Sequence, residues 1–532
     1  MCGIIGGNWF SSKKQTQTHL QKIIHRGRNA SAVEKIGPIF VGHNRLSIQD
    51  LSDTANQPMW NDDKTICIVY NGELWDSQYT KNLRERITIP FRTKSDTEII
   101  LNGYEQFGVD VFKELDGMFS FAIVDTKLNK VFVVRDYVGE LPLWYGIDND
   151  GKLVFCSEKK GLPISDLYEK QVQAIYPGTY LQYDYETLDF KFIQYYKLPN
   201  EIKKEKRPTI VKNIRNLLEE AVRVKMISDV PICTILSGGI DSVITTYILS
   251  RIKPNIEAFV VSMGDGDTMN DDIKYARIAA KEFGVKLHEI ILTEQDVENA
   301  LEETLYVIEQ DRWQNVGSAV AQIALSKKIN ELGFKVVFSG DLSDEIWGSY
   351  GHIQAWHYTP ERYDKARRKL VEDVHKTNFL TTNQSIMWGG TVEIRTPYSW
   401  RPFVEYTLNI PPIYQNEDGH MKPLLRAAFK GEISDELLYR PKVYFAKGCR
   451  TGNMMEAKKE TLKSQLKSLY LYKSLPHEVI GENIINTFKK CFDENGIPDD
   501  VCNDIGIMID DYKKSSVKDN KPYKFNKFNK YA

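Results

Sequence analysis

Short runs of alternating apolar and polar residues occupy the first part of the chain, with Gly, Asn and Asp between them. The clearest runs lie at residues 65–70, 118–124 and 130–134. This period-two pattern is typical of β-strands. Residues 97–107 instead place apolar groups three and four positions apart after Ser95 or Asp96, which predicts a capped helix. Residues 1–195 are therefore predicted to form a mixed α+β domain that is rich in strands.

The pattern changes after a charged, proline-bounded stretch at 196–209, which is predicted to connect two domains. Beyond it, a helix is expected from Ile210, and strands are expected at 230–236, 256–262, 287–292 and 334–338, with helical stretches between them. This order is typical of βαβ units, so residues 210–512 are predicted to form a doubly wound α/β domain with a parallel sheet. Residues 513–532 are rich in Lys and Asn and are expected to form a solvated tail.

The composition limits the kinds of function that are open. With 532 residues, of which 42% are hydrophobic and 27% charged, the chain has the make-up of an ordinary globular protein. Its 70 basic and 72 acidic residues leave a net charge of -2, so neither nucleic acid nor a membrane is an expected partner. The seven cysteines are scattered and form no CxxC pair. We find no apolar run of about 20 residues and no leader. These features predict a cytoplasmic protein.

Cys2 is the first candidate for chemistry. It follows Met1, so removal of that methionine would place a thiol and a free α-amine on one residue. The neutral amine can accept the thiol proton and generate a nucleophilic thiolate without a histidine. Taken alone, however, Cys2 is more simply explained as a small buried apolar residue.

Polar residues in the neighbouring strand-like sequence fit a substrate that carries an α-amine, an α-carboxylate and a carboxamide. Arg45 can bind the carboxylate through two hydrogen bonds, and Glu73 and Asp96 can hold the ammonium. Asn71 and the backbone N–H of Gly72 can form an oxyanion hole. Each residue alone is more simply explained as part of a salt bridge or a turn, so the support comes from the whole set.

A second candidate site lies at the ends of two predicted parallel strands. The first loop follows the strand at 230–236 and contains Ser237, Gly238, Gly239, Asp241 and Ser242. Its backbone N–H groups can bind phosphate, and its aspartate then requires a divalent cation, which indicates Mg²⁺-pyrophosphate. A second acidic loop, which begins at Ser339, contains Asp344 and can complete the metal site. Lys442 can neutralise phosphate charge, although an isolated lysine is usually solvated.

The order and spacing of these motifs resemble the glutamine-dependent asparagine synthetases over about residues 1 to 450. The motifs that match the glutaminase half are Met1–Ile4, His25–Gly27, His43–Ile48, Gln57–Met59, Asn71–Glu73, Ser95–Glu98, Asp116–Phe119 and Arg135–Asp136. Those that match the synthetase half are Ser228–Pro231, Ser237–Ser242, Ser343–Glu345, Val392–Pro397 and Arg440–Lys442. The resemblance implies an N-terminal-nucleophile glutaminase sandwich followed by an ATP-pyrophosphatase domain, with ammonia passing internally between them.

The resemblance also implies the chemistry. Cys2 would attack glutamine and release glutamate and ammonia. ATP, with Mg²⁺ held by Asp241 and Asp344, would adenylate a carboxylate, and ammonia would displace AMP; with aspartate as acceptor the product is asparagine. The nucleotide would lie against Ile235, Val261, Ser339 and Gly340, and Asp341 and Lys442 would take part in catalysis.

Two departures from the family pattern leave the acceptor open. Asp341 stands where the family has Glu, which moves a carboxylate back by one methylene, and Ser399 and Trp400 replace Leu-Asp. The alternatives are the same chemistry on another carboxylate, or a non-catalytic scaffold. A ring-closing ligase needs no ammonia and is disfavoured by the complete glutaminase set. The expected partners are glutamine, ATP, and aspartate or another acid, with a homodimer kept as one option.

Overall fold

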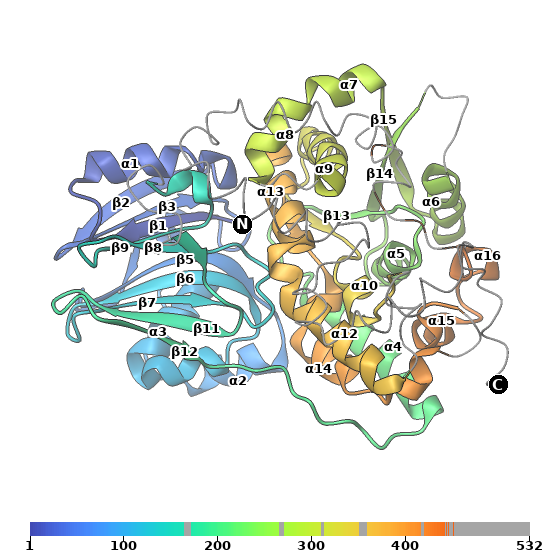
Figure 1. The fold of residues 1–532 in the computed structure, drawn as a ribbon, viewed down its shortest axis with the longest axis horizontal. Helices are drawn as coiled ribbons and strands as arrows, with labels where there is room; N and C mark the ends of the chain where they lie inside the picture. The colour runs from blue at the N-terminus through green and yellow to red at the C-terminus, as the bar shows by residue number, and fades with distance from the viewer. Residues whose placement is uncertain are drawn as a thin grey trace, which may run out of the picture.

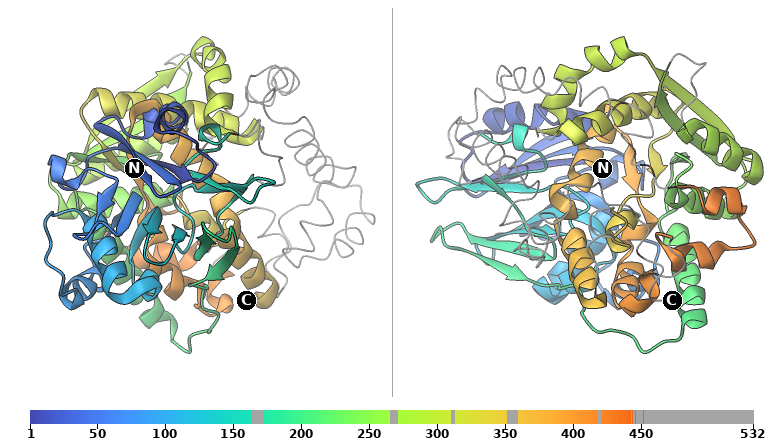
Figure 2. Two further views of the ribbon diagram at one scale, coloured as in Figure 1. Left: turned by 90° about the vertical axis from the view of Figure 1, so that its left-hand side faces the viewer. Right: turned by 45° about the vertical axis from the view of Figure 1, so that its right-hand side comes forward.

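The structure is a computed structural model that describes residues 1–163, 172–264, 271–309, 313–350, 359–416, 420–441, 443, 445 and 451. A half built of antiparallel sheets lies beside a half built of a parallel sheet and helices, and the N-terminus lies where the two meet (Figure 1). In the left view of Figure 2, which is turned by 90°, the first half lies in front of the second. Lys442 and the tail at 513–532 lie outside the described residues.

Two six-stranded antiparallel sheets stack in the first half. The first has the order β10 (Val172–Ala174), β8 (Trp144–Ile147), β9 (Leu153–Cys156), β1 (Gly3–Gly7), β3 (Ile39–Arg45), β2 (Ala30–Ile36). The second has the order β12 (Phe190–Gln194), β11 (Thr179–Asp184), β7 (Lys130–Arg135), β6 (Gly117–Asp125), β5 (Ile66–Leu74), β4 (Met59–Trp60). Fully buried side chains such as Val69 and Val133 fill the layer between the sheets with Ile4 and Val41. The predicted sandwich is therefore confirmed.

Helices cover the outer faces of this sandwich. Helix α1 (Lys13–Gln21) lies on the first sheet, and α2 (Gln78–Arg86) and α3 (Asp96–Phe107) lie on the second (Figure 1). The predicted cap of α3 is confirmed, because Ser95 Oγ accepts a hydrogen bond from the N–H of Thr97. Short 3₁₀ turns occur at η1 (Ile24–Arg26), η2 (Asp53–Ala55), η3 (Gly108–Lys113) and η4 (Lys159–Gly161).

A five-stranded parallel sheet forms the centre of the second half. Its order is β15 (Lys286–Leu292), β14 (Glu257–Met263), β13 (Ile232–Ile235), β16 (Val336–Phe338), β17 (Glu393–Arg395). One face packs against α4 (Arg207–Val224), α5 (Ile240–Ile252) and α6 (Asp271–Phe283), and the other against α8 (Leu301–Ile308), α9 (Trp313–Glu331) and α13 (Asn378–Gly390). Helices on both faces confirm the predicted doubly wound arrangement.

Smaller elements surround this sheet. They are α7 (Glu294–Asn299), α10 (Ser343–Ile346), α12 (Pro360–Asp373), η6 (Val374–Lys376), η7 (Pro397–Ser399), α14 (Arg401–Leu408), η8 (Pro412–Asn416), α15 (Pro423–Phe429) and α16 (Asp435–Leu438). No helix of the described segments is long and apolar enough to cross a membrane.

Helix α4 begins three residues earlier than the sequence pattern predicts. Helix α4 begins at Arg207, within the predicted connector, because Pro208 fits the first turn, where its missing N–H leaves no hydrogen bond unmade. Helix α5 begins at Ile240, so Asp241 and Ser242 lie in its first turn and not in the preceding loop. The chain between β12 and α4 is accordingly limited to residues 195–206.

Candidate functional site

Cys2 lies directly before the first strand of the sandwich and is almost fully buried. Its Sγ lies 3.4 Å from the backbone N of Leu46, and its carbonyl oxygen accepts a 2.8 Å hydrogen bond from Arg26 Nε. Burial raises the pKa of the Cys2 thiol, against the opposing effect of the nearby chain-terminal ammonium. The thiol is therefore protonated at neutral pH, and a nucleophilic role requires a base.

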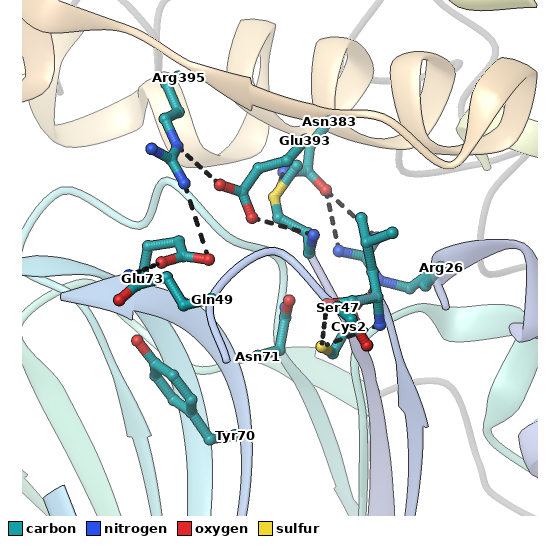
Figure 3. Close-up of polar contacts among 12 residues, drawn as sticks. Cys2, Arg26, Ser47, Gln49, Tyr70, Asn71, Glu73, Asn383, Glu393 and Arg395 are labelled. Atoms are coloured by element: carbon teal, nitrogen blue, oxygen red, sulfur yellow. Dashed lines mark hydrogen bonds and ion pairs between the residues drawn. The ribbon is translucent and has the colours of Figure 1, made fainter. Parts of the chain in front are cut away.

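Asn71 and Gly72 lie in β5, one strand of the sheet beneath Cys2 (Figure 3). Asn71 Nδ2 donates to Ser120 Oγ at 3.1 Å, while Asn71 Oδ1 is buried without a hydrogen-bond partner among the described residues. The predicted oxyanion role requires this amide to turn, after which the Ser120 hydroxyl can donate to Oδ1. At Gly72 a Cβ would lie 2.3 Å from the carbonyl oxygen of Met118, so only glycine fits.

Arg45 lies at the end of β3, where its guanidinium holds the following loop. It donates to the carbonyl of Ser52 at 2.7 Å and to Asn56 Oδ1 at 2.8 Å, and it also contacts the carbonyl of Asp50. A substrate carboxylate would therefore have to share this guanidinium with the loop. The structure thus places Arg45 near Cys2. Some of the N–H groups of its guanidinium already donate hydrogen bonds to the loop.

Glu73 and Asp96 are buried acids on the same side of the sandwich. Asp96 accepts hydrogen bonds from the N–H of Leu74 at 2.8 Å and from Tyr70 Oη at 2.9 Å, and Glu73 accepts one from Gln49. Burial raises the pKa of Asp96 to about 6 and raises that of Glu73 well above its usual range. Two buried carboxylates without a matching number of cations are suited to bind a substrate ammonium.

The phosphate-type loop occupies the carboxyl end of β13. Gly238 has φ +71°, a left-handed conformation that favours glycine, and Ser242 Oγ accepts from the N–H of Ser237 at 3.2 Å. The second loop follows the neighbouring strand β16 and approaches closely, because a Cβ on Gly340 would lie 2.7 Å from Cβ of Asp241. Adjacent parallel strands therefore bring the two predicted loops together.

Asp241 and Asp344 converge on one point, and that point is the ammonium of Lys422. Lys422 Nζ lies 2.6 Å from both carboxylate oxygens of Asp241 and 2.6 Å from Asp344 Oδ1. The lysine side chain is 1% exposed, whereas those of Asp241 and Asp344 are 14% and 23% exposed. Two carboxylates that share one cationic nitrogen can share a metal cation, so this donor set fits Mg²⁺ bound also by phosphate oxygens. Within the described chain no three His, Cys, Asp or Glu residues cluster as a metal site.

Asp341 belongs to the second of these loops and is partly buried. Ser339 Oγ donates to Asp341 Oδ2 at 2.9 Å, and burial raises the pKa of Asp341 to about 6. Ile235 ends β13 next to the loop. Val261 lies in β14 with its side chain in the hydrophobic core, so only its backbone is placed to meet a nucleotide.

Buried charged groups cross the junction between the two halves. Arg26 donates to Asn383 Oδ1 at 3.2 Å in addition to the Cys2 carbonyl. The Met1 ammonium lies 3.0 Å from Glu393 Oε2, and Arg395 bonds to Glu393 and lies 3.7 Å from Glu73 (Figure 3). A third crossing pairs Lys160 with Glu309 at 3.2 Å. The Met1 and Arg395 contacts join the first half to β17, and the Arg26 and Lys160 contacts join it to other parts of the second half.

A cavity of about 20 Å³ lies in this junction. Met118, Glu140 and Leu141 line it from the first half, and Ser339, Asp341 and Asn383 are among the residues that line it from the second. Asn383 is the residue that Arg26 joins to Cys2, and Asp341 belongs to the second loop. The cavity therefore borders the second candidate site, is linked to Cys2 through Asn383 and Arg26, and has room for a molecule of the size of water.

Two family models together match most of the chain. The glutamine amidotransferase domain matches residues 1–204, and the asparagine synthase domain matches residues 213–388 and 360–487. Asparagine synthetase [glutamine-hydrolyzing] 1 from Lotus japonicus is 31% identical over 84% of this chain and 78% of its own length. The corresponding enzyme 1 of Arabidopsis thaliana gives the same three values. A probable asparagine synthetase of Dictyostelium discoideum is 30% identical over 84% of this chain and 85% of its own.

The chain belongs to the glutamine-hydrolysing asparagine synthetase family. It is accordingly an ATP-dependent ligase that joins a glutamine amidotransferase domain to an asparagine synthase domain. The family resemblance expected from the motifs is confirmed.

Sequence reasoning missed three charged residues. It overlooked Lys422, which lies at the N-terminus of α15, where the helix dipole disfavours an ammonium. That unusual position could have identified Lys422. The role expected of Lys442 stays a prediction, because this residue lies outside the described residues. Glu393 and Arg395 were quoted in a motif without a role, although two opposite charges within a short buried strand indicate an ion pair.

Proposed function

We propose that this protein makes asparagine from aspartate, ATP and glutamine, with ammonia passing through the cavity in the junction. The cavity is the observation that carries the proposal, because residues of both halves line it and Asp341 of the second half is one of them. A neutral molecule of ammonia matches a space of this size. An enclosed route prevents ammonia from being protonated and lost to water.

In the first half, Cys2 acts as the nucleophile in the form that has lost Met1. The α-amine of Cys2 accepts the thiol proton, Sγ attacks the carboxamide carbon, and the proton leaves with ammonia. The resulting thioester is hydrolysed by water to glutamate. Asn71 and the N–H of Gly72 stabilise the tetrahedral oxyanion. Arg45 holds the glutamine carboxylate, and Glu73 and Asp96 hold its ammonium.

In the second half, the loop Ser237–Ser242 binds the ATP phosphates through backbone N–H groups and the start of α5. Asp241 and Asp344 would hold Mg²⁺, which supplies charge neutralisation of the pyrophosphate when bound. Lys422 lies between the same carboxylates in the structure, so Mg²⁺ would take the place of its ammonium. An aspartate carboxylate oxygen attacks the α-phosphorus, and pyrophosphate leaves. Asp341, which borders both the cavity and this loop, accepts a proton as ammonia displaces AMP.

A second acceptor is supported by one observation. Asp341 is one methylene shorter than the glutamate of the family pattern, which leaves more room at the end of the cavity for an acid other than aspartate. Free buried thiols at Cys67, Cys156 and Cys233, together with the dependence on ATP, support a cytoplasmic location.

The experiment that tests the proposal measures pyrophosphate, asparagine and glutamate in one reaction. The purified full-length protein, its N-terminus checked by mass spectrometry, is incubated with ATP, Mg²⁺ and glutamine, with and without aspartate. Pyrophosphate and asparagine in equal amounts, both dependent on aspartate, are the expected result. Glutamate without aspartate-dependent pyrophosphate would refute aspartate as the acceptor and lead to a panel of other acids. No pyrophosphate with any acid would support a non-catalytic scaffold.

A further inference from the structure

Glu140 is a buried carboxylate that the chemistry described above does not use. It lines the junction cavity, it is 6% exposed, and its Oε1 has no hydrogen-bond partner in the described part of the chain. A buried carboxylate oxygen without a donor is costly, because it has lost its hydration and gained nothing in return. Such a group needs a role or a ligand.

The backbone holds Glu140 at the cavity wall. Asp136 Oδ1 accepts hydrogen bonds from the N–H groups of Val138, Gly139 and Glu140 at 3.1, 2.6 and 3.0 Å. Arg135 Nε donates to the carbonyl of Leu141 at 2.7 Å on the other side of Glu140. The segment is therefore fixed at both ends, and the Glu140 side chain cannot move to solvent without breaking this loop.

The nearest cation stabilises the charge of Glu140 but makes no close hydrogen bond to its Oε1. Lys225 Nζ lies 3.7 Å from Glu140 Oε1, which is too far for a direct hydrogen bond. Its ammonium instead donates to the carbonyl of Thr396 at 2.8 Å and to Ser399 Oγ at 2.6 Å. The positive charge makes an ionised Glu140 tolerable in the interior, while the carboxylate oxygen stays available as an acceptor. Burial raises the pKa of Glu140 to about 7, so both of its protonation states are accessible at neutral pH.

We propose that Glu140 forms a binding site for ammonia in transit, with its free oxygen accepting an N–H of the molecule inside the cavity. Ammonia offers three N–H donors and is about the size of water, so it fits the acceptor and the space together. The site rests on the proposed function, since it presupposes that ammonia passes through this cavity. Its role is to hold ammonia in the passage until the acyl-adenylate has formed at the Asp341 end.

The test compares the full-length enzyme with Glu140→Gln, which keeps the side-chain volume but replaces the carboxylate. Reactions contain ATP, Mg²⁺, the acceptor acid, unlabelled glutamine and ¹⁵N-ammonium chloride. Two quantities are measured: amide product per glutamate released, and ¹⁵N in the amide. We expect Glu140→Gln to lower the first by about fivefold, the size expected for one lost hydrogen bond, and to raise the second. Glutamate release should persist and shows that the variant is folded.

A matched control is Glu309→Gln, which removes a buried carboxylate from the same junction but not from the cavity wall. It should keep the ratio and the label content of the unmodified enzyme. If Glu140→Gln fails to fold, Glu140→Gln combined with Lys225→Met removes both buried charges and should show the same loss of coupling. An unchanged ratio in the folded Glu140 variant, or an equal loss in Glu309→Gln, would overturn the inference. Absence of amide with the unmodified enzyme would overturn the proposed function as well.

Discussion

Replacement of Lys422 by methionine tests whether a metal ion can bind between Asp241 and Asp344 in place of the lysine ammonium. The substitution keeps the side-chain length but removes the ammonium that both carboxylates contact at 2.6 Å. Loss of one partner from a fully buried ion pair costs about 3–5 kcal/mol. The two carboxylates here are 14% and 23% exposed, so water recovers part of this loss. We expect destabilisation of about 2–3 kcal/mol, when that recovery is taken into account.

The assay is thermal unfolding with and without Mg²⁺. For a domain of this size, the loss corresponds to a decrease in Tm of about 5–10 °C in the absence of Mg²⁺. Added MgCl₂ should raise the Tm of Lys422→Met more than that of the unmodified protein, because the metal can then bind where the ammonium was. Binding to the folded state stabilises it by mass action. Lys430→Met, at the exposed far end of α15, is the matched control and should change neither value.

Two results would refute this reasoning. An equal response to Mg²⁺ in Lys422→Met and in the unmodified protein would show that the lysine and the metal do not compete for the two carboxylates. An equal decrease in Tm in the Lys430 variant would show that the loss arises from α15 itself and not from the charges.

Three further predictions concern the two reactions. Cys2→Ala should lower glutamine-dependent amide formation by on the order of 10³ or more, while amide formation from ammonium chloride stays within about twofold; loss of both activities would contradict separate sites. The KM for glutamine should rise by about tenfold per pH unit below about pH 6. Burial raises the pKa of Asp96 to about 6, so its protonation there removes the negative charge that faces the ammonium. The same pH profile in Asp96→Asn would exclude this cause. Asp341→Glu should lower pyrophosphate release by about tenfold through overpacking of the cavity, with glutamate release unchanged. An increase in pyrophosphate release would mean that the shorter side chain of Asp341 limits the activity of this enzyme.

The sequence carried enough information for the architecture and for where the two loops meet. Alternation of apolar residues located β5, β6 and β7, and Ser95 located the start of α3. The convergence of Asp241 and Asp344 followed from a general property of parallel sheets, since β13 and β16 are neighbours. These features depend on local pattern and on topology, which a single sequence expresses directly.

The charged residues at the junction could not be predicted in the same way. Glu140 lies in a loop and Glu393 in a three-residue strand, and nothing in either local pattern says that the other half of the molecule covers it. Burial of a charge depends on which distant surface packs against it, and ordinary sequence statistics place such residues in solvent. Lys422 was missed for the same reason, since its partners lie 181 and 78 positions away.

The charged pairs across the junction also determine whether the two halves can be produced separately or exchanged for those of a relative. Arg26, Lys160 and Arg395 each face a polar or acidic partner that belongs to the other half. A half expressed alone would present these groups, and the floor of the Cys2 pocket, to water. Exchange of either half for that of a distant relative would leave buried charges without their counterparts. The protein is therefore expected to tolerate division only when both pieces are produced together and can reassemble around this junction.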